Sequence, residues 1–269
     1  MVDVAIESRK ATLVTFRGGG FDPVARTWVS WLFFAGTIVL WQAASHARLI
    51  DPLFLPSPLA IARSLNELAL SGELARHFGA SLVRIGGGWI IGAAAGVLVG
   101  GLIGLFWLWR SAGLPFISAL FPIPKIALLP LLILWFGIGE ASKVATIALG
   151  VFFPMAISTY AGVDNVPRNL IRMTQSFNVP FLRIVANVII PGMLPSVLAG
   201  CRISASIALI LVVAAEMIGA NVGIGALVLT AGNLMQTDKL MAGIVAISIL
   251  GLVIGATISW LERTLLGWR

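Results

Sequence analysis

Charged residues are scarce in this sequence. Aspartate, glutamate, lysine and arginine make up 11% of its 269 residues, whereas a soluble domain carries roughly 25%. Hydrophobic residues make up 59%, and the mean hydropathy is +1.01. This composition indicates a protein that is solvated mostly by lipid. The length leaves no room for a large additional soluble domain.

Cysteine and histidine are nearly absent. Cys201 is the only cysteine, so an intrachain disulfide is excluded, and His46 and His77 form no metal-binding pattern with it. The sequence also lacks the His-Glu-x-x-His and Gly-x-Ser-x-Gly motifs and the Gly-x-x-x-x-Gly-Lys-[Ser/Thr] phosphate loop. We therefore expect no catalytic residue, no metal site and no cofactor bound by this chain, and no ATP binding through such a loop.

What the sequence does contain is a series of long apolar runs. Each is long enough, or nearly so, to cross a bilayer as a helix. The predicted spans are residues 28–46, 84–108, 114–136, 143–162, 196–219 and 241–261. We thus predict an all-α, polytopic transmembrane helix bundle over residues 28–269, preceded by a polar N-terminal segment, residues 1–27. The first span is interpreted as uncleaved.

The distribution of basic residues predicts the orientation of the spans. The net charge is +7, but no basic stretch interleaves with aromatic residues, so nucleic acid is not an expected partner. With a cytoplasmic N-terminus, ten Lys and Arg residues lie in inside segments and six in outside segments. Cytoplasmic loops carry the excess of such residues. Both termini are therefore predicted to be cytoplasmic, with residues 47–83 outside.

Three local patterns refine this arrangement. Ser57 and Pro58 fit the start of a helix over residues 57–70, interpreted as interfacial. The second span carries a row of glycines four residues apart, which predicts close helix packing. These are Gly88, Gly92, Gly96, Gly100 and Gly104. Four prolines in the third span predict a kinked or broken helix, which is tolerated within a membrane only against protein or beside a water-filled pathway.

Two ionisable residues fall well inside predicted spans. Lys125 is near the middle of the third span and Glu216 near the outer end of the fifth. Because a charge within the bilayer is costly, such residues usually face a bundle interior or water. A pathway role and a structural pairing both stay open for Lys125, with Glu216 as one candidate partner. Arg202 is expected to snorkel to the cytoplasmic interface.

The longest predicted cytoplasmic connection, residues 163–195, has the pattern of two short helices around a turn. Pro167 suits a helix start, and Asn178 suits the left-handed position that follows a helix. Pro180 then suits the first turn of a second helix. Leu170, Met173, Thr174 and Phe177 give the first helix an apolar face. The segment is either a docking site for a cytosolic partner or a loop that rests on its own bundle.

At this segment the sequence resembles the permease subunits of binding-protein-dependent ABC importers, in particular the nitrate, sulfonate, taurine and bicarbonate group. That family's motif is Glu-Ala-Ala, three residues, Gly, nine residues, Ile, one residue, Leu-Pro. Pro191 matches the final proline, Val188 the isoleucine and Asn178 the glycine. Arg172, Met173 and Thr174 fall on Glu-Ala-Ala, so spacing is retained while identities differ. Similar blocks occur at residues 55–58, 122–131, 135–143 and 215–225.

The resemblance implies a type I importer permease. Two permease chains, usually a homodimer, would line the pathway, and a periplasmic binding protein would deliver a small anion such as a sulfonate, taurine or nitrate. Cytosolic ATPase subunits, which use the ATP, would dock through Leu170, Arg172, Met173, Thr174, Phe177, Asn178, Val188 and Pro191. Lys125 and Glu216 are pathway candidates, and the location would be a bacterial inner membrane. The alternative function is a secondary transporter driven by an ion gradient.

Overall fold

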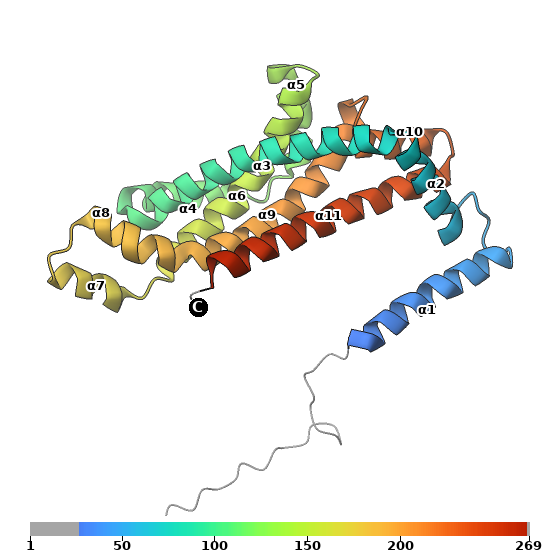
Figure 1. Ribbon diagram of the computed structural model, residues 1–269. Coiled ribbons are helices and arrows are strands. Elements are labelled where there is room, and N and C mark those ends of the chain that lie inside the picture. The colour runs from blue at the N-terminus through green and yellow to red at the C-terminus, as the bar shows by residue number, and fades with distance from the viewer. Residues whose placement is uncertain (1–26, 268–269) are drawn as a thin grey trace, which may run out of the picture.

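A computed structural model describes residues 27–267, and these residues form a bundle of helices without strands (Figure 1). Five helices are long and apolar enough to cross a membrane, and a bent pair of helices makes up to six. The prediction of an all-α bundle with about six spans is confirmed. Residues 1–26 lie outside the described residues, so the structure leaves the predicted N-terminal segment untested.

The helices follow one another with short connections. In chain order they are α1 (Thr27–His46), α2 (Pro58–Leu70), α3 (Glu73–Leu105), α4 (Trp107–Leu120), a 3₁₀ turn (Lys125–Leu128), α5 (Leu129–Phe136), α6 (Glu140–Asp164), α7 (Arg168–Ser176), α8 (Phe181–Ile184), a π turn (Val185–Ile189), α9 (Ile190–Gly219), α10 (Ile224–Asn233) and α11 (Thr237–Leu265). The bundle has two ends in Figure 1, named here the α10 end and the α7 end after the short helices that lie there.

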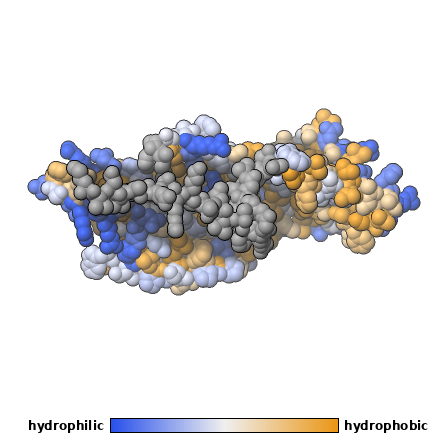
Figure 2. Space-filling view, turned by 90° about the horizontal axis from the view of Figure 1, so that it is seen from below, coloured by the Kyte–Doolittle hydropathy of each residue, from blue (hydrophilic) through white to orange (hydrophobic). Residues whose placement is uncertain are grey.

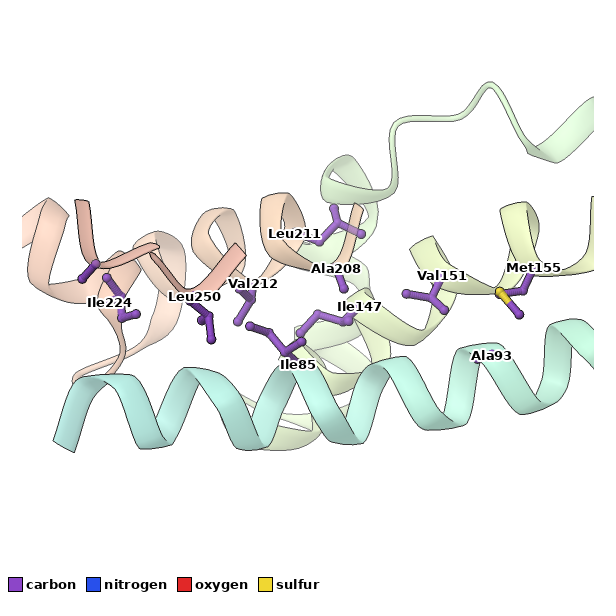
Figure 3. Close-up of a cluster of buried hydrophobic side chains, with 11 residues drawn as sticks. Ile85, Ala93, Ile147, Val151, Met155, Ala208, Leu211, Val212, Ile224 and Leu250 are labelled. Carbon is purple, nitrogen blue, oxygen red and sulfur yellow. The ribbon is translucent and has the colours of Figure 1, made fainter. Parts of the chain in front are cut away.

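The core lies among α3, α6, α9 and α11. Figure 3 shows Ile85, Val212 and Leu250 converging between their helices, and all three are buried. Val151 of α6 and Ile224 of α10 belong to the same cluster. Because these side chains come from five helices, one continuous core holds the long helices together.

The glycine row brings α3 and α6 into backbone contact, as predicted. A Cβ atom placed on Gly88 would lie 2.6 Å from the Cβ of Ile147, and one on Gly104 would lie 2.6 Å from the Cβ of Val163. At Gly92 the added atom would meet the carbonyl oxygen of Ala148. Small residues at such positions let two membrane helices pack closely.

We therefore expect Gly92→Ala to destabilise the purified protein by about 1–3 kcal/mol, the range for overpacking a well-packed interior. Gly101→Ala is the matched control on the same helix, because no atom lies within 4 Å of its added Cβ. The measurement is the melting temperature in detergent. Equal melting temperatures for the two variants would contradict close α3–α6 packing.

α1 stands apart from the bundle. Its spanning window has no buried residues, and Trp31 and Phe33 are strongly exposed. Figure 2 shows a broad hydrophobic surface over this helix. A helix that is apolar on all sides suits a lipid environment.

The helix predicted over residues 57–70 is present as α2, and its interfacial position stays a prediction. The side chain of Ser57 accepts a hydrogen bond from the backbone N–H of Ala60 at 3.1 Å, and Pro58 occupies the first turn. Ile61 and Leu68 point into the bundle and are buried.

Two helices begin well before the spans predicted for them. The second span was expected to begin at residue 84, but α3 begins at Glu73, because residues before the apolar run continue the same helix. The fifth span was expected at 196–219, whereas an apolar helical stretch runs from Phe181 to Gly219. Hydropathy marks where lipid contact begins and does not mark where a helix begins.

Candidate functional site

At the α7 end, the turn after α7 has the geometry that the sequence predicts. Asn178 has a φ of 54°, and its N–H donates to the carbonyl of Gln175 at 2.9 Å. The N–H of Val179 donates to the carbonyl of Thr174 at 3.2 Å. This pair of bonds is a Schellman motif, in which a residue in the left-handed region closes the helix.

α7 divides its apolar residues between two faces. Ile171 packs inward against the buried cluster around Val166 and Ile184. Leu170, Met173 and Phe177 are exposed, and 74% of Phe177 is accessible. Arg172 is exposed as well, while Thr174 is half-buried and bonds the carbonyl of Ile171 at 2.8 Å. The helix is therefore anchored through one face and offers three large apolar side chains on the other.

The second helix of this segment is not a separate element. α8 begins after Pro180 and continues through the π turn into α9. Ile190 N–H bonds the carbonyl of Val185, five residues back. Pro191 lacks an N–H, and the wider π turn lies just before it. Val188 packs inward in the same turn, so it and Pro191 belong to the base of the spanning helix.

The third span is broken, as predicted, at residues 121–124. α4 and the following helix pair meet at an angle of 89°. The Lys125 ammonium donates to the carbonyls of Leu120, Phe121 and Ile123 at 2.8, 3.0 and 2.6 Å. It also lies 4.3 Å from the centre of the Phe153 ring. Its three donors therefore hold the break together, and a pathway role for Lys125 stays a prediction.

Glu216 does not pair with Lys125, so that candidate pairing is wrong. Its buried carboxylate accepts from the Nη1 of Arg84 at 2.7 Å, from the Ser81 hydroxyl at 2.8 Å and from the backbone N–H of Gly225 at 2.9 Å. A side chain on Gly223 would overlap this carboxyl group. The packing of α3 against α9, which the sequence does not reveal, selects Arg84 as the partner.

Arg84 is the centre of an ionic cluster at the α10 end, named here the Arg84 cluster, made of Ser81, Arg84, Glu140, Lys143 and Glu216. Arg84 is 4% exposed. It donates through Nε and Nη2 to Glu140 and through Nη1 to the carbonyl of Val222 at 2.6 Å. Buried charges are tolerated in this way only when they are paired and hydrogen-bonded.

Sequence reasoning missed Arg84, Glu140 and Lys143 because it placed them at span edges or in outside segments. One local signal was available: Glu140 and Lys143 are three residues apart, the spacing of a helical ion pair. Lys143 is 5% exposed, and its ammonium lies 3.5 Å from Glu140.

Arg202, expected to snorkel, forms an exposed ion pair with Glu262 of α11. Among residues 27–267 no group of His, Cys, Asp or Glu could hold a metal ion.

Comparison with known proteins gives a consistent picture. Residues 92–266 match the family described as the binding-protein-dependent transport system inner membrane component. The chain is 35% identical over 243 residues to a putative aliphatic sulfonates transport permease protein SsuC of Bacillus subtilis, covering 90% of this chain and 88% of that protein. It is 36% identical over 237 residues to the taurine transport system permease protein TauC of Escherichia coli, covering 86% of each.

The fold itself has solved counterparts. A chain of the MetNI methionine ABC transporter, described in inward-facing conformations, superposes with a TM-score of 0.57. The match covers 73% of this chain and 95% of that chain at 21% sequence identity. The type I importer permease fold, expected from the resemblance, is thereby confirmed.

Proposed function

This chain belongs to the family of inner membrane components of binding-protein-dependent transport systems, and we propose that it forms the membrane pathway of an ATP-driven importer for a small organic sulfonate such as taurine. It is a multi-pass membrane protein of a permease family, and its family is one of transport proteins rather than enzymes. The ATP would be hydrolysed by separate cytosolic subunits, and no cofactor would be bound by this chain.

The substrate class rests on one observation. Relatives named for aliphatic sulfonates and for taurine are 35% and 36% identical to this chain over nearly its whole length. A relative named for formylaminopyrimidine transport is 33% identical over 243 residues. Formylaminopyrimidine is therefore the comparison substrate in the test of uptake.

The coupling to ATP is assigned to α7. Its three exposed apolar side chains and its anchored opposite face suit a helix that carries force from a docked partner into the bundle. Arg172 stands where the family motif has Glu, so an acidic residue on the ATPase should face it. A second copy of this chain would complete the pathway, and a periplasmic binding protein would deliver the solute to the α10 end.

Uptake into proteoliposomes tests this function. Vesicles carrying the permease and its ATPase subunit, with ATP inside and binding protein outside, should accumulate labelled taurine. Without ATP, an imposed proton or sodium gradient should drive no taurine uptake. Uptake driven by the gradient alone would establish the secondary-transporter alternative, and uptake of formylaminopyrimidine in place of taurine would overturn the substrate class.

The orientation proposed here puts both termini and the α7 end in the cytoplasm of a bacterial cell and the α10 end outside its inner membrane. Ser71 precedes α3 at the α10 end, and Ser176 ends α7; both are exposed. With Cys201 replaced by serine, a cysteine at position 71 should react with a membrane-impermeant thiol reagent in intact cells. A cysteine at position 176 should react only after permeabilisation, and the reverse pattern would overturn the orientation.

A further inference from the structure

The Arg84 cluster borders a polar pocket at the α10 end. The pocket has a volume of about 560 Å³, within the range of roughly 300–1,000 Å³ typical of small-molecule sites. Its lining includes Arg84, Glu140 and Lys143 together with the segment 217–222. Two buried cations therefore border a hollow that opens where, on the proposed function, the solute arrives.

Lys143 is not fully satisfied in this position. Its side chain is 6% exposed, and its ammonium has two partners among residues 27–267: the carbonyl of Gly139 at 3.2 Å and the Glu140 carboxylate at 3.5 Å. An ammonium group has three donors, and burying donors without acceptors is costly. One N–H donor of this buried cation is thus left for a group that enters the pocket, and a second becomes available once Glu140 turns away.

The two carboxylates of the cluster differ in how firmly they are held. Glu216 is buried and accepts hydrogen bonds from Ser81, Arg84 and Gly225. The Glu140 side chain is 63% exposed, and within the described part of the chain it is held by two hydrogen bonds from Arg84 and, at 3.5 Å, by Lys143. Glu140 gives up two charge-assisted hydrogen bonds to Arg84 when it turns into water, so it leaves only when an incoming anion replaces it there. Its exposure means that water then solvates the released carboxylate.

The charges of the cluster also favour replacement of Glu140 by an incoming anion. Arg84 and Lys143 carry two positive charges, and Glu140 and Glu216 carry two negative charges, so the cluster is neutral as it stands. Once Glu140 turns away, the pocket has a net charge of +1. A planar guanidinium that holds a carboxylate through two N–H groups suits two oxygens of another oxyanion equally well.

We propose that this pocket is a binding site for the anionic head of the transported solute, with Lys143 as its primary ligand and Glu140 as an internal competitor that occupies Arg84 when no solute is present. This inference rests on the proposed function, which supplies an organic anion at the α10 end. The neutral resting state suits a site that must release its ligand during transport.

Thermal unfolding of the purified permease–ATPase complex, without binding protein, tests the site. A ligand that binds only the folded state raises the melting temperature in a dose-dependent way. Methanesulfonate is the probe, and dimethyl sulfone of similar shape, but without charge, is the control at constant ionic strength. The melting temperature of the wild type should rise with methanesulfonate and stay unchanged with dimethyl sulfone.

Two substitutions should move the response in opposite directions. Lys143→Gln should raise the concentration of methanesulfonate needed for a given shift by about tenfold, the effect of losing one strong charge-assisted contact. Glu140→Gln should lower that concentration by a similar factor, because the competitor has lost its charge. Misfolding cannot produce this improvement. Glu262→Gln, which removes the carboxylate of the Arg202 pair at the other end, should leave the response unchanged.

Identical dose responses in wild type, Lys143→Gln and Glu140→Gln would overturn the site. A shift with phosphatidylglycerol but none with methanesulfonate would identify a lipid phosphate as the occupant and overturn it as well. If taurine is taken up while these responses do not differ, the site is wrong and the proposed function stands. If no sulfonate is taken up while the responses follow the expected order, the site stands and the proposed substrate is wrong.

Discussion

Phe177→Ala is expected to reach the membrane in normal amounts and to lose most of its association with the ATPase subunit. Phe177 is the most exposed of the three apolar side chains on the free face of α7. A central aromatic anchor in an interface typically contributes about 2 kcal/mol or more, which corresponds to roughly 30-fold in the dissociation constant. The measurement is co-purification of the ATPase with the permease, together with transport-coupled ATP hydrolysis.

Substitutions at Asn178 separate the shape of the turn from the contact itself. Asn178→Gly keeps the left-handed conformation and should bind the ATPase like the wild type. Asn178→Val places a β-branched residue at a φ of 54°, with a strain of roughly 1–2 kcal/mol, and should weaken docking. Leu234→Ala is the matched control, because Leu234 is an exposed apolar residue that follows α10 at the other end. If Phe177→Ala and Asn178→Val couple like the wild type, α7 is not the docking element.

Arg84→Met is expected to cause the largest loss of stability of any single charge removal in the described chain. It would leave the Glu216 carboxylate, which is 1% exposed, without a cation. Breaking one side of a buried ion pair typically costs about 3–5 kcal/mol, which is a large share of the stability of a marginally stable protein. We expect a lower melting temperature in detergent and less protein in the membrane.

Two comparisons test whether the buried charge is the cause. Arg202→Met removes the cation of an ion pair that is 56% exposed on the arginine side, and such pairs contribute about 0–1 kcal/mol. The double variant Arg84→Met with Glu216→Gln removes both charges and should recover part of the lost stability. Equal losses for Arg84→Met and Arg202→Met, or no recovery in the double variant, would contradict a stabilising role for the Arg84–Glu216 pair.

The break in the third span shows how far local sequence reasoning reaches and where it stops. Four prolines predicted that the helix would not continue, and it turns by 89°. The same reasoning left Lys125 with two roles and proposed a distant carboxylate as its partner. The ammonium instead bonds carbonyls between two and five residues away. Those carbonyls become available only because the broken backbone turns them toward Lys125.

The sequence by itself determined the features that depend on neighbours along the chain. Apolar run length predicted the spans, Ser57 and Pro58 predicted the start of α2, and Asn178 predicted the left-handed turn after α7. Each of these follows from backbone hydrogen bonding or side-chain sterics within a few residues. The glycine row was also readable, because a spacing of four places its members on one face of a helix.

Only the tertiary structure decided which charges meet. Arg84 lies 56 residues from Glu140 and 132 residues from Glu216 in the chain. Neither hydropathy nor helical periodicity carries information about such pairs. Their meeting depends on how deeply α3 and α6 interlock at the glycines and on the loop that returns from α9 to α10. A membrane helix continues past its apolar run, so charges that hydropathy places at span edges or outside can be drawn into the protein interior, where a low dielectric makes their pairing obligatory.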